Sequence, residues 1–268
     1  MKRLMLLCLL ATAAFAQDAQ VRGKQLIDEA VAALGGEKFL NMQNRIETGR
    51  AYSFFQNNLT GLSPARFYTR YVPVDPAKAG EVLAQQEHQA LGKNEGYYNV
   101  LREEGGWEVT YRGPKPLEDE QVMRHRDSTM HNVFYILRTR LKEPGLVFES
   151  RGSYVIENTP MNIVDIIDSK NRVVTVYLHP TTHLPLRQKW AWRDAERERN
   201  EELTRFSRYR DVAGVQWPYQ VTRERNGRKS FEMFDDEVVI NQQIDEARFA
   251  KPDVNSKPFG TSTTTKKK

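Results

Sequence analysis

The chain has 268 residues, of which 39% are hydrophobic and 28% are charged. These proportions are typical of a globular protein and exclude collagen-like, low-complexity and multi-span membrane chains. The 40 lysines and arginines only slightly exceed the 35 aspartates and glutamates, and charges of both signs alternate along residues 193–199. This pattern is typical of a solvated surface, so we expect no nucleic-acid partner.

The first sixteen residues have the order of a secretory signal peptide. Lys2 and Arg3 form a cationic start, residues 4–10 are apolar, and small residues continue to Ala16. The apolar run is shorter than the roughly 20 residues of a membrane-spanning helix, which favours a cleaved segment over an anchor. We expect cleavage near Ala16 and a periplasmic or secreted protein. The one cysteine lies in this segment, and a mature domain without disulfides favours the bacterial periplasm.

Two segments have the periodicity of amphipathic helices. In residues 21–34 apolar side chains recur on one face, Gly35 and Gly36 supply a stop, and a short helical turn follows at 37–42. Residues 118–142 carry a second stripe, which we expect to form part of a lid. Its members are Val122, His125, Met130, Val133, Phe134, Ile136, Leu137 and Leu141.

Most of the remaining chain has the pattern of β-strands. Residues 81–91 are ambiguous between a short helix and an edge strand. Glycine- and asparagine-bearing turns, such as Asn226-Gly227, indicate hairpins between neighbouring strands. The predicted strands are residues 45–55, 65–74, 97–102, 107–112, 146–156, 161–167, 172–179, 184–192, 201–210, 215–223 and 229–240.

The fold class that follows is mainly β with helices (α+β). We expect a single strongly curved antiparallel sheet of roughly ten strands, forming a half-open barrel lidded by helices. The sequence shows no internal repeat. We divide it into a signal peptide (1–16), one half-barrel domain (17–255) and a disordered tail (256–268).

Polar residues that could form a catalytic or metal site are few. His179 and His183 have the spacing of metal ligands on a helix, but Pro180 places them in a turn. His125 and His131 do not share a helical face, so we expect one to be packed and the other solvated. No nucleophile elbow, phosphate-binding glycine loop or redox cysteine pair occurs, and we expect no catalytic residue, metal or cofactor. We assign structural roles to four aspartates that could suggest a calcium site or a carboxylate pair: Asp165, Asp168, Asp235 and Asp236.

Aromatic and apolar residues share one face of several predicted strands. On residues 184–192, Trp190 and Trp192 alternate with Arg187 and Lys189, which we expect to face water together with Arg193. Such faces form either a packed barrel core or a lining that stays partly open for an apolar ligand. The predicted ligand-binding lining is Trp107, Val133, Phe134, Leu137, Trp190, Trp192 and Trp217.

Several stretches of the sequence carry a resemblance to a known family. The strand pattern of residues 162–178 continues into His-Pro-Thr-Thr-His-Leu-Pro at 179–185. Residues 206–218 read Phe-Ser-Arg-Tyr-Arg-Asp-Val-Ala-Gly-Val-Gln-Trp-Pro, and 241–252 form a closing motif. With the signal peptide and the helix that ends at Gly36, this arrangement resembles the periplasmic lipoprotein-carrier superfamily, the LolA-like proteins that include LolB- and LppX-like members.

The resemblance implies a half-open barrel whose helical lid covers bound acyl chains during outer-membrane lipoprotein sorting and transport. It also implies an arginine on an early strand that latches the lid, for which the candidates are Arg45, Arg50, Arg66 and Arg70. We therefore predict a non-enzymatic, periplasmic lipid- or lipoprotein-binding carrier with an apolar cavity. Its partners would be lipid or lipoprotein acyl chains and envelope membrane proteins.

Two alternatives stay open at this point. The first is a non-catalytic structural or partner-binding module of the cell envelope, in which the same fold has a filled core. A cavity of several hundred Å³ would favour the carrier over this module. The second is a hydrolase with scattered carboxylates, which would need two carboxyl groups converging in one cleft.

Overall fold

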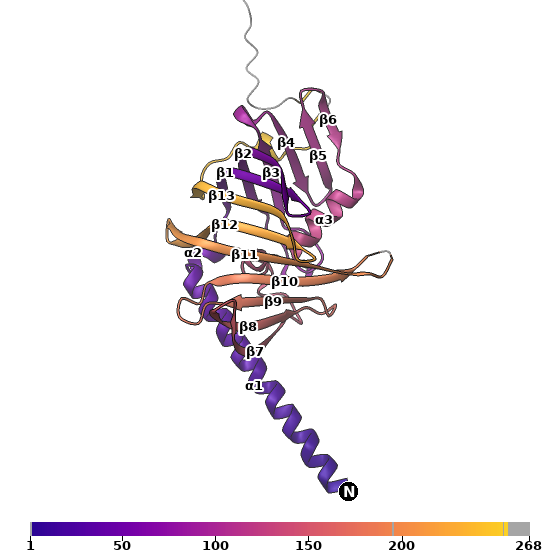
Figure 1. Cartoon of the computed structure of the whole chain (residues 1–268), viewed down its shortest axis with the longest axis vertical. Helices are drawn as coiled ribbons and strands as arrows, with labels where there is room; N and C mark the ends of the chain where they lie inside the picture. The colour runs from indigo at the N-terminus through magenta and orange to yellow at the C-terminus, as the bar shows by residue number, and fades with distance from the viewer. Residues whose placement is uncertain (1, 195, 254, 257–268) are drawn as a thin grey trace, which may run out of the picture.

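Two helices lead the chain into the sheet (Figure 1). The computed structural model describes residues 2–194, 196–253 and 255–256. α1 runs without a break over Lys2–Leu34, and α2 covers Glu37–Leu40. Gly35 ends α1 with a φ of 124°, and a Cβ atom there would lie 2.5 Å from the Gly214 carbonyl oxygen. The residue is therefore glycine both for its backbone conformation and for this close approach.

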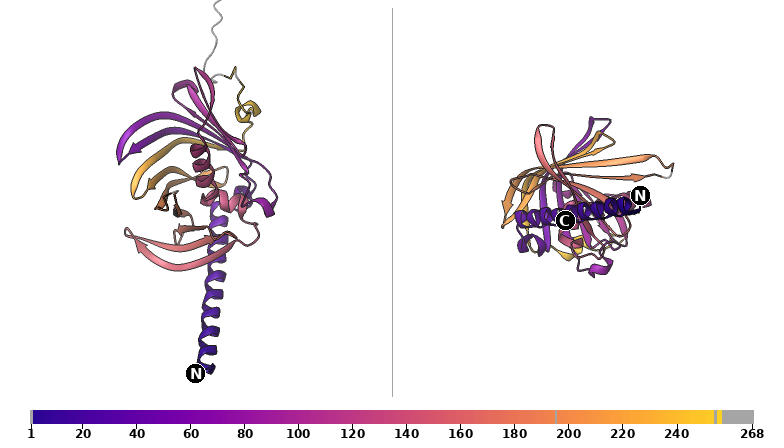
Figure 2. Two further views of the ribbon diagram at one scale, coloured as in Figure 1. Left: turned by 90° about the vertical axis from the view of Figure 1, so that its right-hand side faces the viewer. Right: turned by 90° about the horizontal axis from the view of Figure 1, so that it is seen from below.

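Thirteen antiparallel strands form one sheet in the described part of the chain. They are β1 (Asn44–Phe55), β2 (Asn58–Tyr71), β3 (Gln85–Leu91), β4 (Tyr97–Arg102), β5 (Gly105–Thr110), β6 (Gly113–Pro116), β7 (Val147–Ile156), β8 (Thr159–Ile167), β9 (Val173–Leu178), β10 (Pro185–Arg193), β11 (Arg199–Val212), β12 (Val215–Arg225) and β13 (Arg228–Ile240). Their order is β6-β5-β4-β3-β2-β1-β13-β12-β11-β10-β9-β8-β7, so β1 pairs with β13 in the middle. The sheet curves strongly and stays open (Figure 2), which confirms the predicted fold class.

The two edge strands explain why helices lie over the opening. β6 and β7 are consecutive in sequence but occupy opposite edges of the sheet. The chain between them therefore has to pass from one edge to the other, and it does so on the concave side (Figure 2). This connection contains α3 (Asp119–Met130), α4 (Val133–Tyr135) and a π-helical turn, η3 (Ile136–Arg140). Topology thus places the predicted lid.

The predicted helix 118–142 is wrong in one respect, because it breaks at Asn132. Asn132 has an extended backbone, and its side-chain oxygen accepts hydrogen bonds from the Phe134 and Tyr135 amides. The Val133 amide donates instead to Gln188 Oε1 of β10 at 2.7 Å. An asparagine cap and a glutamine from a distant strand satisfy the backbone groups that the break releases.

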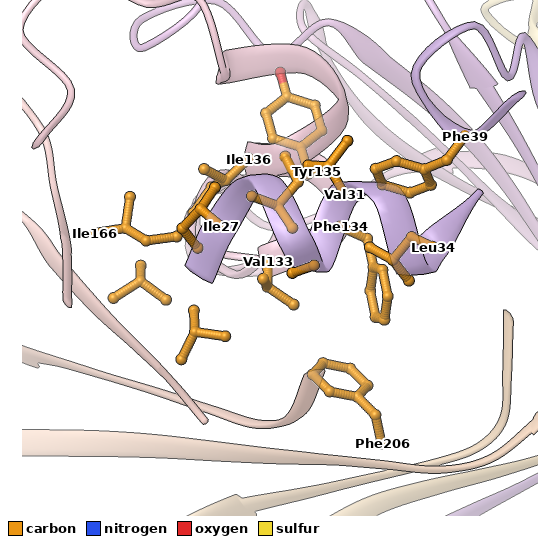
Figure 3. Close-up of a cluster of buried hydrophobic side chains, with 14 of the residues drawn as sticks. Ile27, Val31, Leu34, Phe39, Val133, Phe134, Tyr135, Ile136, Ile166 and Phe206 are labelled. Atoms are coloured by element: carbon orange, nitrogen blue, oxygen red, sulfur yellow. The ribbon is translucent and has the colours of Figure 1, made fainter. Parts of the chain in front are cut away.

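The main core lies between the concave face and the helices (Figure 3). Ile27, Val31 and Leu34 of α1 pack with Val133 and Phe134 of α4 and with side chains of β8, β11 and β12. Each of these side chains is less than a tenth exposed. Burial of such side chains stabilises the fold by roughly 1.5–3 kcal/mol each.

Three strand predictions need correction. The ambiguous segment 81–91 contains β3, which is an interior strand between β2 and β4. The sequence did not predict β6, because a Gly-Pro-Lys-Pro segment lacks strand pattern; prolines are tolerated there since β6 is an edge. Arg187 does not face water: it is 8% exposed and donates two hydrogen bonds to the Glu157 carboxylate. Trp190 is buried, as predicted.

The two ends of the chain carry the predicted signal peptide and the predicted disordered tail. Residues 257–268 of the predicted disordered tail lie outside the described residues. The predicted signal peptide forms the first part of α1, which extends away from the sheet (Figure 1). Among the described residues, no helix combines the length and the apolar character needed to cross a membrane.

Candidate functional site

A cavity of about 960 Å³ lies between the concave face of the sheet and the helical connection. Its walls come from β1–β4 on one side, from β10–β13 on the other, and from α3 with the start of α4. Strands from both halves of the sequence therefore contribute, because the β1–β13 pairing joins the two halves into one curved surface. The sequence predicted an apolar lining. In the structure the lining instead consists of an aromatic wall and a polar wall.

The aromatic wall consists of Phe134, Trp190, Trp192, Phe206 and Trp217. The Phe134 ring meets Phe206 edge-to-face at 4.8 Å and Trp217 at 4.9 Å, measured between ring centroids. Trp190 and Trp192 stack at 4.5 Å. These contacts hold the rings in place, so the ring edges that border the cavity form a preformed apolar surface.

The polar wall begins at Arg45 on β1. Its Nε donates to Glu47 at 3.0 Å and its Nη1 to the Tyr71 hydroxyl at 2.6 Å. Glu47 also accepts a hydrogen bond from Trp217 Nε1 at 2.9 Å, which connects the two walls. Burial opposes the positive charge of Arg45, but attraction to Glu47, Tyr71 and Glu87 together outweighs burial and holds the guanidinium pKa above its ordinary value.

The polar wall continues on β3, β4 and α3. Glu87 accepts hydrogen bonds from the side chains of Gln85 and Gln89, the latter at 2.6 Å. Burial opposes ionisation of Glu87, but attraction to neighbouring guanidiniums and the hydrogen bond from Gln89 outweigh it and lower the pKa of the carboxyl. Burial also lowers the pKa of His125, so the imidazole is neutral at neutral pH. His125 Nε2 and Asn99 Oδ1 are buried and make no hydrogen bond within the described chain.

The structure brings four of the seven predicted lining residues together. Phe134, Trp190, Trp192 and Trp217 all border the cavity. Val133 and Leu137 do not, because both are fully buried in the main core. Trp107 lies on β5 and packs against a separate apolar cluster that contains Tyr98. The apolar stripe of residues 118–142 therefore does not form one surface. Phe134 borders the cavity, whereas Val133 and Leu137 pack in the core.

Sequence reasoning missed most of the polar wall. Gln85, Glu87 and Gln89 alternate on β3 and all face the cavity. This period-two run of polar residues was the available signal, since it indicates that the strand has a polar face. Which face the helical connection would cover was not visible in the sequence. The missed residues are Glu47, Gln85, Glu87, Gln89, Asn99 and Arg223.

Of the four early-strand arginines, Arg45 borders the cavity. The other three form ion pairs elsewhere. Arg50 approaches Asp236 at 3.4 Å, Arg66 approaches Glu95 at 3.8 Å, and Arg70 pairs with Glu246.

The remaining histidines and aspartates have structural partners in most cases. His179 Nδ1 accepts the Thr181 and Thr182 amides within its turn. Of the two helical histidines, His131 is packed, in line with the prediction that one of them would be, whereas His125 is partly buried and not fully solvated. Among the described residues no group of histidine, cysteine, aspartate or glutamate could hold a metal ion.

Asp168 and Asp235 differ in their surroundings. Asp168 accepts hydrogen bonds from Arg140 at 3.0 Å and from Arg172 at 2.6 Å, so its role is structural. Asp235 is buried on β13, and neither of its side-chain oxygens has a hydrogen-bond partner in the described chain. Burial and the neighbouring Glu47 raise the pKa of Asp235 to about 9.

Comparisons with known proteins find solved structures that have a similar fold. No protein-family model and no curated protein sequence matches the chain. A DUF1329 family protein from Desulfovibrio piger is similar with a TM-score of 0.57 at 13% identity, over 85% of this chain and 97% of that one. A structure designated as an outer membrane lipoprotein-sorting protein domain, from Vibrio parahaemolyticus, gives a TM-score of 0.55 at 12% identity, over 86% of this chain and 97% of that one.

A third structure belongs to the LolA superfamily and comes from Nitrosomonas europaea. It has a TM-score of 0.51 at 8% identity and covers 85% of this chain and 97% of that one. At such identities the likeness establishes the fold alone. The chain has a LolA-like fold, as the resemblance in its sequence predicted.

Proposed function

We propose that this chain is a periplasmic carrier that binds the acyl chain of a lipid or lipoprotein in the cavity beneath α3. The observation that carries the proposal is the cavity of about 960 Å³ with its aromatic wall. Ligand sites for small molecules have volumes of roughly 300–1,000 Å³. Each methylene buried against the wall would contribute about 0.8 kcal/mol to binding. The fold shared with a LolA superfamily protein supports the same reading.

The cavity also separates this proposal from its alternatives. A structural module with a filled core would leave no space of this size on the concave side. A hydrolase would need two carboxyl groups free to act in one cleft. Glu47 and Glu87 both border the cavity, but Glu47 is paired with Arg45, and the lowered pKa of Glu87 leaves it no proton to donate at neutral pH. These contacts support binding over hydrolysis.

The periplasmic location is part of the proposal and rests on the first sixteen residues. A carrier in that compartment would exchange its cargo with membrane proteins of the envelope. The cargo would leave past α3, which borders the cavity as one short helix between its caps, Glu118 and His131.

The tryptophans offer a direct test of binding. Three of the four, Trp190, Trp192 and Trp217, border the cavity and Trp107 does not. Bromine atoms on an acyl chain quench tryptophan fluorescence on contact, so dibromostearate should quench the protein saturably. Trp107→Phe should keep this quenching, whereas replacing the other three by phenylalanine should remove it. Absence of saturable quenching in the parent protein would contradict the carrier.

A matched pair of valine variants tests the wall itself. Val221 borders the cavity, whereas Val173 on β9 is 40% exposed. Val221→Glu places a carboxylate beside the acyl chain and should weaken dibromostearate binding by about tenfold or more, because a charge beside apolar surface is costly. Val173→Glu should leave binding unchanged. Equal effects of the two variants would argue against binding in this cavity, and native mass spectrometry of lipid extracts would identify the natural cargo.

A further inference from the structure

Two buried polar atoms point to a particular class of ligand. His125 Nε2 on α3 and Asn99 Oδ1 on β4 belong to cavity-lining residues, and neither makes a hydrogen bond within the described chain. Buried polar atoms in native proteins almost always have a partner from the protein, from water or from a ligand. Both residues belong to the polar wall.

The charges on this wall already balance one another. Arg45 is paired with Glu47 at 3.0 Å. Glu87 is held by Gln85 and Gln89, and Arg223 is close enough to Glu87 to influence its ionisation. Two carboxylates and two guanidiniums therefore offset each other beside a neutral imidazole. A ligand group with a net charge would leave one charge unmatched in a buried place, whereas a neutral hydroxyl would not.

Three of the other charged residues around the cavity are partly buried, and each has a partner. Asp194 accepts a hydrogen bond from Asn200, Glu202 accepts one from Trp190 Nε1, and Arg225 lies over the Trp192 ring. The remaining four lie nearer to solvent. Glu120, Arg124 and Asp127 are exposed on α3, and Glu196 is exposed at the tip between β10 and β11. Glu120 and Arg124 form an ion pair with each other. These groups belong to the rim, so they do not change the balance of charge on the inner wall.

We infer that the cavity takes an amphiphile with an uncharged, hydroxyl-bearing head group, whose hydroxyls hydrogen-bond to His125 Nε2 and Asn99 Oδ1 while its acyl chain lies on the aromatic wall. This inference rests on the proposed carrier function and adds the chemistry and the orientation of the ligand. The head group is held inside the cavity, and Asn99 Oδ1 can only accept, so the ligand must supply a hydrogen-bond donor.

Three probes with the same acyl chain test the inference: monooleoylglycerol, methyl oleate and oleate. Affinities would be measured by displacement of a fluorescent fatty acid below the concentrations at which the lipids aggregate. Monooleoylglycerol should bind about tenfold tighter than methyl oleate, which corresponds to one or two net neutral hydrogen bonds. It should also bind tighter than the charged oleate. Equal affinities for monooleoylglycerol and methyl oleate would overturn the inference but leave the carrier proposal standing.

Variants assign the preference to the two side chains. Asn99→Leu and His125→Phe should each lower the monooleoylglycerol preference, and together they should abolish it while methyl oleate still binds, because only the hydrogen bonds are lost. His125→Gln keeps a hydrogen-bonding group and should retain part of the preference if the phenylalanine variant does not fold. Asn58→Leu, at an exposed position on β2, is the control and should leave the preference intact. A preference that persists undiminished in both Asn99→Leu and His125→Phe would overturn the inference, and no binding of any probe by the parent would instead contradict the carrier.

Discussion

The indole ring of Trp190 lies nearly parallel to the imidazole of His131, with ring centroids 4.2 Å apart and planes 7° from parallel. His131 follows directly on α3 and Trp190 belongs to β10, so the stack joins the helical connection to the sheet. Trp190 Nε1 also donates to Glu202 at 3.3 Å. One side chain thus holds the end of α3, packs in the core and borders the cavity.

Replacing Trp190 by alanine should destabilise the protein by about 3–5 kcal/mol, because a large buried ring is removed and the space cannot close completely. The free energy of unfolding in urea would measure the effect. Tyr111→Ala is the control, since Tyr111 is 77% exposed, and it should change stability by less than about 0.5 kcal/mol. Similar losses in both variants would show that Trp190 does not join lid and sheet.

Arg140 of η3 should be essential for stability because two buried carboxylates depend on it. Its side chain is 3% exposed and pairs with Glu143 at 2.7 Å and Asp168 at 3.0 Å. Arg140→Met should cost about 3–5 kcal/mol, since it leaves Glu143 buried without its cation and removes one of the two guanidiniums that pair with Asp168. Arg151→Met is the control, because Arg151 is 57% exposed and 3.7 Å from Asp165; such a pair contributes less than about 1 kcal/mol.

The same network sets a dependence on acidic pH. Burial opposes ionisation of Asp168, but its hydrogen bonds to Arg172 and Arg140 outweigh burial and lower its pKa. The stabilisation is therefore present above the ordinary carboxyl pKa and is lost as the pH falls towards the lowered value. Arg140→Met should flatten this acid dependence, measured by urea unfolding at a series of pH values. An unchanged acid profile would contradict this role of Arg140.

Asp235 should have the opposite pH dependence. Its pKa of about 9 in the folded protein lies far above the ordinary carboxyl value, so the folded state keeps a proton that the unfolded chain releases. Stability should therefore fall as the pH rises from about 4 towards 9. Asp235→Asn mimics the protonated form and should raise the free energy of unfolding at pH 8 by more than about 1.4 kcal/mol, the equivalent of one pKa unit.

The neighbouring Asp236 provides the control for this prediction. Its side chain is 62% exposed and approaches Arg50 at 3.4 Å. Asp236→Asn should have little effect at any pH, and Asp235→Asn should have none near pH 3, where both states are protonated. Equal stability of the Asp235→Asn and parent proteins at pH 8 would show that the carboxyl of Asp235 is ionised in the fold.

Export with cleavage near Ala16 is the last prediction. Mass spectrometry of the protein from a periplasmic extract should find an N-terminus at or near Gln17, because the preceding residues have the order of a signal peptide. Folding should survive this loss: among residues 17–34 of α1, the buried ones begin at Gly23. Replacing Ala14 and Ala16 by arginine should block processing, and full-length protein confined to the cytoplasm of the parent strain would contradict the periplasmic proposal.

The sequence by itself determined those elements that depend on near neighbours. The stop at Gly35-Gly36, the Asn226-Gly227 hairpin and the alternation that buries Trp190 follow from backbone freedom, turn geometry and the period of a strand. Each involves only a few consecutive residues. The curved sheet and its helical covering followed from joining such elements in order.

Only the tertiary structure decided where the predicted helix is interrupted and where polar residues are buried. The amphipathic stripe of 118–142 predicts a continuous helix, but Gln188 from β10 accepts the Val133 amide and makes a break at Asn132 tolerable. The polar wall has the same origin: Glu47 is acceptable in a buried position because Trp217, 170 residues away, donates to it. A buried polar group is stable only with its partner, and partners brought together by the β1–β13 pairing are not neighbours in the sequence.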